Sequence, residues 1–175
     1  MVDFARRTVQ VLGAPIDVVD WADAIGRIVA WGAQRESRYV CICNVHSVVT
    51  ASSDPNFARV VCEADMATPD GAPVAWMIRR AGHIDQQRIN GPDLMWRYLA
   101  VAQQQEQPVY FYGGTQRTLD TLRERMAPAG MLLQQIEAGA PLVHQPRQQR
   151  PGLVRQQGGW LVAPQGLTGA HHHVG

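Results

Sequence analysis

Three short polar segments carry residue types that could do chemistry, and each follows a stretch that is expected to form a strand. The first, Asn44-Val45-His46 with Ser47, offers an amide, an imidazole and a hydroxyl. The second, Pro69-Asp70-Gly71, places a carboxylate just ahead of an expected helix. The third, Gly113-Gly114-Thr115, puts small residues before a helix, where backbone N–H groups can face a phosphate. Ligands of open α/β sheets bind beyond the carboxyl ends of strands, so these segments form the candidate site.

Each of these residues also has a purely structural interpretation. Asp70 can cap the helix that follows it, and Asn44 and Ser47 can be turn and cap residues. His46 can be an ordinary loop histidine, and the glycine pair lacks the GxGxxG pattern of a dinucleotide-binding turn. The residues alone leave these alternatives open.

Arginine has to carry any side-chain charge that binds an anion, because all 16 basic residues are Arg. The lack of lysine excludes a lysine nucleophile, a Schiff base and a P-loop lysine. Arg88, among turn residues, is the candidate partner of an anionic leaving group, whereas Arg79 and Arg80 fit a solvated helix face. The sequence has no metal-spaced His/Cys cluster and no DxD pair, so no metal and no cofactor are expected.

Alternating strands and helices are expected to position these segments. The expected strands cover 8–13, 39–43, 64–68 and 108–112. The expected helices cover 20–34, 47–51, 54–61, 72–81, 93–102 and 118–126, and Asp93 is the expected cap of the fifth. This alternation predicts the α/β class: a Rossmann-like layered domain with a mainly parallel sheet.

Composition fits a single globular domain in a reducing compartment. The chain has 175 residues, is 46% hydrophobic and has a formal net charge of +1, which gives no support for nucleic-acid binding. Three cysteines, two of them in the apolar run Cys41-Ile42-Cys43, argue against a disulfide framework and for buried strand thiols. With neither a signal peptide nor about 20 consecutive apolar residues, a cytoplasmic protein is expected, free to rest on a membrane surface.

The last part of the chain departs from this pattern. Residues 1–137 hold 13 Arg and all 15 acidic residues, whereas residues 138–175 hold three Arg and no acid. The second segment is rich in Gln, Pro and Gly, and only 160–162 suggests a strand there. We therefore expect an α/β domain over 1–137 and an atypical tail over 138–175, either disordered or translated in another reading frame.

Four motifs in order resemble the WecG/TagA/CpsF glycosyltransferases, glycosyltransferase family 26, over about residues 8–127. They are Asn44–Val49, Ala64-Asp65 with Pro69-Asp70-Gly71, Arg88–Met95 and Phe111–Thr115, and the opening Gly13–Asp17 also fits. The resemblance implies inverting, metal-independent transfer of a sugar from a UDP-sugar, of the UDP-ManNAc or UDP-glucose type. The implied acceptor is a polyprenyl-diphosphate-linked sugar in cell-surface or exopolysaccharide biosynthesis.

The resemblance also assigns roles to individual residues. It makes Asp70 the general base, Asn44 a residue that holds the sugar or the acceptor, and Arg88 the cation that stabilises the leaving diphosphate. The other residues expected to line the substrate site are His46, Gly71, Asn90, Gly91, Asp93, Gly113, Gly114 and Thr115. Ile42 stands where members of the family often have a threonine.

The resemblance implies contact with a membrane surface and self-association, but the chain lacks a family motif. No P-[KR]-Q-E-like sequence, which contributes to the family's nucleotide site, follows Gln135. The alternative hypothesis is therefore a truncated remnant that only packs against partners. A third hypothesis is a nucleotide-binding α/β protein with another reaction.

Overall fold

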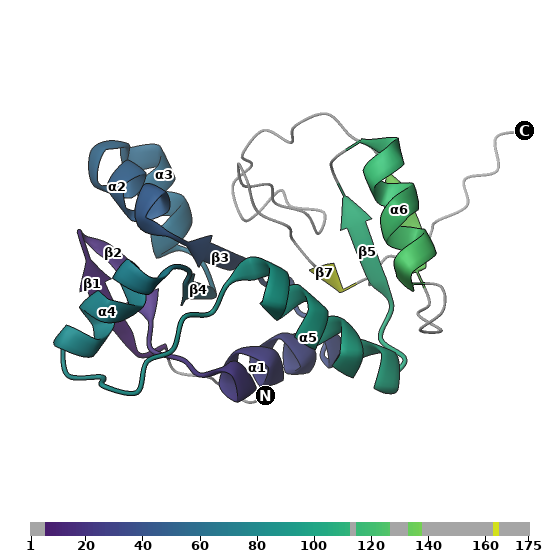
Figure 1. The fold of residues 1–175 in the computed structure, drawn as a ribbon, viewed down its shortest axis with the longest axis horizontal. Helices are drawn as coiled ribbons and strands as arrows, with labels where there is room; N and C mark the ends of the chain where they lie inside the picture. Colours follow the sequence, from purple (N-terminus) through teal and green to yellow (C-terminus); the bar gives the residue numbers. More distant parts are fainter. Residues whose placement is uncertain (1–5, 113–114, 127–132, 138–162, 165–175) are drawn as a thin grey trace, which may run out of the picture.

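The computed structural model describes residues 6–112, 115–126, 133–137 and 163–164, and Figure 1 shows its elements. The strands are β1 (Thr8–Val11), β2 (Ala14–Asp17), β3 (Val40–Cys43), β4 (Met66–Pro69), β5 (Val109–Tyr112), β6 (Leu133–Glu137) and β7 (Ala163–Pro164). The helices are α1 (Trp21–Ala33), α2 (Val45–Ser53), α3 (Pro55–Cys62), α4 (Ala72–Arg80), α5 (Gly91–Gln104) and α6 (Gln116–Met126). The predicted alternation of strands and helices, and with it the α/β class, is confirmed.

The strands of the described residues form three small sheets. Parallel pairing joins β3 to β4 and β5 to β6, as the alternation predicts. Two antiparallel pairings accompany them, between β1 and β2 and between β5 and the two-residue β7. Neither β6 nor β7 was predicted, and β7 follows directly on the expected strand at 160–162. The rest of the predicted tail lies outside the described residues.

The first strand prediction is wrong in its extent, because a hairpin occupies this segment. Leu12 and Gly13 both have positive φ, 52° and 83°, and form the two-residue turn between β1 and β2. Two successive positive φ values are the mark of the type I′ turn, which suits the right-handed twist of hairpin strands. Gly13 therefore reverses the chain instead of ending a strand.

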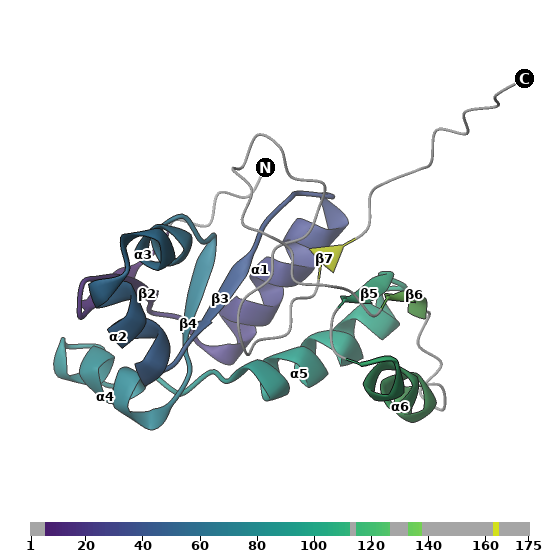
Figure 2. The same cartoon turned by 90° about the horizontal axis from the view of Figure 1, so that it is seen from above.

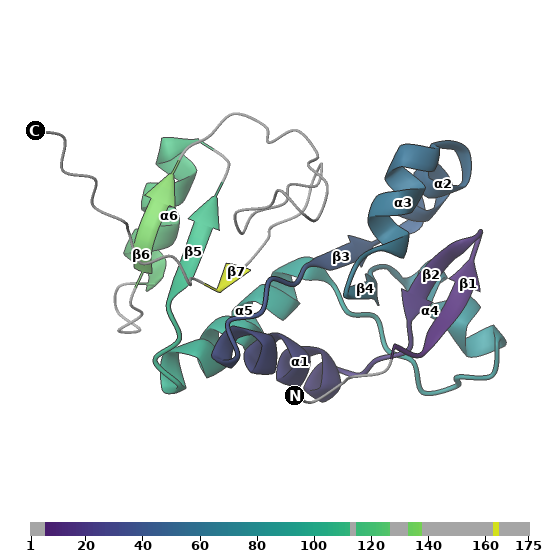
Figure 3. The same ribbon diagram turned by 180° about the vertical axis from the view of Figure 1, so that it is seen from behind.

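Helices cover both faces of the β3–β4 pair. On one face, Cys41 and Cys43 pack with residues of the hairpin and of α2, α3 and α4. On the other face, Val40 and Ile42 pack against residues of α1 and α5, which lie side by side in Figures 2 and 3. The strands are buried on both faces, as the apolar run at 39–43 predicts for a parallel pair.

Three helices begin two residues earlier than predicted, because the capping residue lies three positions before the expected start; the first is α2, which Asn44 caps. Asn90, not Asp93, is the N-cap of α5: its side-chain oxygen accepts the Asp93 N–H at 2.9 Å. Thr115 caps α6, since its Oγ1 accepts the Thr118 N–H at 3.2 Å. In all three helices the predicted first residue is the third residue of the helix, where the donor of a cap hydrogen bond lies.

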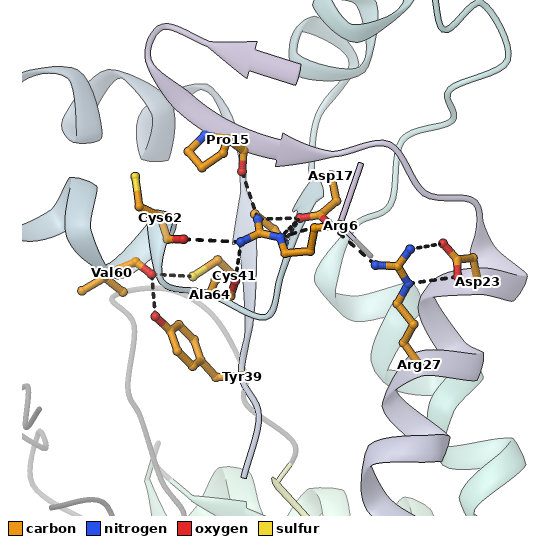
Figure 4. A network of polar contacts seen from close by, with 11 residues as sticks. Arg6, Pro15, Asp17, Asp23, Arg27, Tyr39, Cys41, Val60, Cys62 and Ala64 are labelled. Carbon is orange, nitrogen blue, oxygen red and sulfur yellow. Dashed lines mark hydrogen bonds and ion pairs between the residues drawn. The ribbon is translucent and has the colours of Figure 1, made fainter. Parts of the chain in front are cut away.

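A buried carboxylate fastens the hairpin to the parallel pair (Figure 4). Asp17 is fully buried, and its Oδ2 accepts the backbone N–H of Ala67 in β4 and the Arg6 guanidinium, each at 2.7 Å. Arg27, which pairs with Asp23 at 2.7 Å, lies 3.9 Å from the other Asp17 oxygen. Asp17, quoted above in the family's opening motif, therefore has a structural role here.

Across the described ranges, no helix is both long enough and apolar enough to span a bilayer.

Candidate active site

Asn44 and Asp70 lie at the same edge of the β3–β4 pair. Each is the first residue after its strand, and Cys43 pairs with Pro69 at the ends of the two strands. The Asp70 N–H donates to the Cys43 carbonyl oxygen at 2.9 Å, which extends the ladder by one residue. The carboxyl ends of parallel strands meet at one edge, so both polar residues reach the position that the sequence predicts for a ligand site.

Asp70 does not cap the helix that follows it. Gly71 is the N-cap of α4, and no side chain completes that cap. Gly71 has φ 102° and ψ 142°, a conformation that glycine adopts without strain. The turn leaves the Asp70 carboxylate free of the cap, with 23% of its side chain exposed. The structural interpretation of Asp70 as a helix cap is therefore wrong.

Arg88 is brought to this carboxylate by the loop between α4 and α5. Its Nε lies 3.5 Å from Asp70 Oδ1, and 54% of the Arg88 side chain is exposed. The next residue, Ile89, is fully buried, and its N–H donates to the Pro69 carbonyl oxygen at 2.9 Å. A long, half-exposed ion pair contributes little stability, so Arg88 can exchange the carboxylate for a phosphate at little cost.

Asn44 caps a helix, which is the structural interpretation that the sequence left open for it. It is the N-cap of α2, and its Oδ1 accepts the Ser47 N–H at 3.0 Å and lies 3.3 Å from the Ser47 hydroxyl oxygen. The cap uses the oxygen and leaves the amide nitrogen for another partner. His46 is exposed on the first turn of α2.

The expected site residues at the start of α5 form a reciprocal cap. Asn90 is buried; besides accepting from Asp93, its Nδ2 donates to the exposed Asp93 carboxylate at 2.6 Å. Gly91 sits against β3, where an added Cβ would lie 3.5 Å from the Ile42 side chain. Ile42, in the place that the resemblance gives to a threonine, therefore supports the start of α5 by packing.

The third predicted segment does not join the other two in the described residues. Gly113 and Gly114 lie outside them, and Thr115 is engaged in the cap of α6. Figure 1 places α6 on the opposite side of the molecule from α2 and α4. The structure thus brings Asn44, Asp70 and Arg88 together and leaves Thr115 apart.

The sequence analysis missed Gln86, which fixes the loop that carries Arg88. Only 6% of Gln86 is exposed, and its side-chain oxygen and nitrogen bond the N–H and the carbonyl of Val19. A glutamine in a polar, turn-rich stretch resembles a surface residue. Its partner lies 67 residues away in sequence, so no local signal could have identified it.

Cys43, directly before Asn44, is not a candidate nucleophile. Burial, with smaller contributions from Cys41 and Asp17, raises the pKa of the Cys43 thiol far above its ordinary value. Nucleophilic attack requires the thiolate, which this environment suppresses. The described residues also contain no group of three His, Cys, Asp or Glu side chains able to hold a metal ion.

We expect Cys62 to react with a thiol reagent in the folded protein, and Cys41 and Cys43 to react only after unfolding. Cys62 is exposed and the other two are buried. The folded state disfavours the Cys43 thiolate, so the stability linked to this thiol is present below the ordinary thiol pKa, about 8.5, and is lost as the pH rises above it. Titration with Ellman's reagent, with and without denaturant, measures which thiols react, and melting curves at pH 7 and 10 measure the loss of stability. Rapid reaction of all three thiols in the folded protein would contradict the prediction for Cys41 and Cys43.

Comparison with known proteins relates the chain to a family and to a curated relative. The sequence pattern of the glycosyl transferase WecG/TagA/CpsF family matches residues 9–150, well over half of the chain and past residue 137. A curated protein of Bacillus spizizenii, N-acetylglucosaminyldiphosphoundecaprenol N-acetyl-beta-D-mannosaminyltransferase, is 29% identical over 93 residues. This alignment covers 53% of the chain and 36% of the relative, so the match spans about a third of the relative's length.

Proposed function

Because the chain belongs to the WecG/TagA/CpsF glycosyl transferase family, we propose that it transfers a sugar from a UDP-sugar to a lipid-linked acceptor. The donor is of the UDP-ManNAc or UDP-glucose type, and the acceptor is a sugar linked to polyprenyl diphosphate. The name of the Bacillus relative, a mannosaminyltransferase acting on a diphosphoundecaprenol-linked sugar, supports this choice. The product would enter cell-surface polymer biosynthesis.

The pairing of Asp70 with Arg88 carries the proposal. It joins a carboxylate that no helix cap uses to a cation that is half exposed, with 3.5 Å between Oδ1 and Nε. Glycosyl transfer from a nucleotide sugar needs both functions in one site, on opposite faces of the anomeric carbon: a base for the acceptor hydroxyl and a positive charge for the departing diphosphate. The weak pair allows Arg88 to turn from Asp70 to the diphosphate when the donor binds. Asn44, at the same edge, adds an amide that can hold a sugar hydroxyl.

In the proposed mechanism, the acceptor hydroxyl oxygen attacks the anomeric carbon from the face opposite UDP. Asp70 takes the hydroxyl proton as the new carbon–oxygen bond forms and the bond to the diphosphate oxygen breaks. UDP leaves with the electron pair of that bond, and the Arg88 guanidinium stabilises the charge that develops on it. Inversion at the anomeric carbon follows from this single displacement.

A panel of UDP-sugars tests the proposal directly. The full chain is assayed for UDP release with a short-chain polyprenyl-diphosphate-sugar acceptor, and its melting temperature is measured with each donor. Turnover together with stabilisation by one donor supports the proposal. Neither effect with any donor would support the non-catalytic remnant instead, and stabilisation by a nucleotide without transfer would support a different nucleotide-dependent reaction.

Two substitutions at Asn44 separate its cap role from its proposed substrate role. Asn44→Ala should lower the free energy of unfolding by about 1 kcal/mol, because the cap of α2 is lost. Asn44→Ser keeps a capping oxygen but removes the amide, so we expect near wild-type stability with about tenfold slower transfer, the effect of one hydrogen bond to the reacting sugar. Denaturant unfolding and UDP release measure the two effects. Full activity of Asn44→Ser would assign the residue to the cap alone.

A further inference from the structure

We propose that Gln86 is a positioning residue, which holds Arg88 beside Asp70 through the backbone of the α4–α5 loop. This inference rests on the proposed function, because it concerns the delivery of the cation that would meet the diphosphate. Gln86 is not part of the motifs that the sequence singled out.

The Arg88 side chain is too loosely held to set its own position. Its described polar contact is the 3.5 Å approach to Asp70, and 54% of the side chain is exposed. A flexible side chain with one weak partner points where its backbone directs it. The fixed points of the loop on either side of Arg88 therefore decide whether the guanidinium reaches the carboxylate.

Gln86 supplies the fixed point on one side. Its Oε1 accepts the Val19 N–H at 3.1 Å, and its Nε2 donates to the Val19 carbonyl oxygen at 2.7 Å. The same Nε2 donates to the Gln87 carbonyl oxygen at 2.8 Å, which ties the side chain to its own loop. Val19 is buried in the link between β2 and α1, so the loop is anchored to the interior.

Two further hydrogen bonds hold the loop, one on each side of Arg88. Arg79 of α4 donates from Nη1 to the Gln86 carbonyl oxygen at 2.9 Å. On the other side of Arg88, the Ile89 N–H donates to the Pro69 carbonyl oxygen at 2.9 Å. Arg88 thus lies between an anchor at Val19 and an anchor at the end of β4, the strand that leads into Asp70.

The carboxamide of Gln86 matches the chemistry of its anchor. Val19 presents both an N–H and a carbonyl, and the carboxamide offers an acceptor to the first and a donor to the second. Glutamate keeps the acceptor, but its carboxylate has no hydrogen for the Val19 carbonyl. Leucine is similar in size and satisfies neither group.

Amide hydrogen exchange measured by NMR on the full chain tests whether Gln86 anchors the α4–α5 loop, without relying on activity. In Gln86→Leu we expect exchange at the Ile89 amide to accelerate about tenfold, because the loop opens locally when its other anchor is lost. Amides of the β3–β4 ladder, which lies in the core, report global stability and should change much less. The matched control is Gln87→Leu, an exposed neighbour with the same chemical change, which should leave Ile89 protected.

Gln86→Met, which is unbranched and close to glutamine in length but satisfies neither Val19 group, serves as a second variant with the same acceleration expected, and it keeps the test valid if the leucine variant does not fold. Wild-type protection of the Ile89 amide in a folded Gln86 variant would overturn the proposal.

A double-mutant cycle on UDP affinity distinguishes positioning from general destabilisation. Gln86→Leu should weaken UDP binding about tenfold when Arg88 is present, and less than about twofold in an Arg88→Gln background. Equal losses in both backgrounds would show that Gln86 does not act through Arg88. If the wild-type chain does not bind UDP, the proposed function fails, while the exchange experiment still decides whether Gln86 holds the loop.

Discussion

Asp70→Asn should slow sugar transfer by about 10²–10⁴-fold, the range that a general base contributes. Asparagine has nearly the same shape but cannot accept the proton of the acceptor hydroxyl at neutral pH. The fold should be unaffected, because Asp70 does not cap α4 and its ion pair with the half-exposed Arg88 is long. We therefore expect a melting temperature within a degree or two of the wild type, from a change below about 0.5 kcal/mol.

The matched control for this variant is Asp85→Asn, which removes an exposed carboxylate from the neighbouring loop. It makes the same change in net charge and should keep wild-type transfer. UDP release measures the rate, and a titration with the UDP-sugar checks that Asp70→Asn still binds the donor. Retained turnover in Asp70→Asn would remove Asp70 from the role of base, and an equal loss in Asp85→Asn would point to charge alone.

Asp17→Asn should lower the free energy of unfolding by about 3 kcal/mol, because it breaks a buried ion pair from one side. Asp17 is fully buried, and Arg6 and Arg27 lie within 2.7 and 3.9 Å of its oxygens. Asparagine still offers an oxygen to the Ala67 N–H, but it leaves two guanidinium groups without that counter-charge. The loss falls on the junction between the hairpin and β4, so the whole face packed against α2, α3 and α4 is weakened.

Asp23→Asn is the control for Asp17→Asn, because it makes the same substitution at a more exposed ion pair. Asp23 also pairs with Arg27, but 35% of its side chain is exposed and the pair is a helical i,i+4 contact. Such pairs contribute at most about 1 kcal/mol, so this variant should be clearly milder. Urea unfolding of both proteins measures the difference. Equal losses in the two variants would contradict the assignment of the main stabilising charge to Asp17.

The two aspartates show how one side-chain type acquires two roles from its surroundings. Asp17 is buried, charge-paired and bonded to the backbone of β4, so it can stabilise but cannot meet a substrate. Asp70 stands at the end of the same strand, partly exposed and outside any cap. Only the second environment allows proton transfer to or from a ligand.

The sequence by itself determined the order of strands and helices and the place of Asn44 and Asp70. Apolar runs of four or five residues between helical patterns predict buried parallel strands, and residues that follow such strands meet at one edge for geometrical reasons. The same reasoning did not find the β1–β2 turn or the start of α5, because a cap or a turn depends on one local hydrogen bond or φ angle.

Only the tertiary structure decided which polar residues act together. Whether Asp70 caps α4 depends on the backbone of Gly71, and whether Arg88 reaches Asp70 depends on how a whole loop is anchored. That anchor joins Gln86 to Val19 across 67 residues, a contact that no periodicity or spacing encodes. Local patterns report which face of an element is buried, whereas the pairing of distant polar groups is settled only when the elements pack.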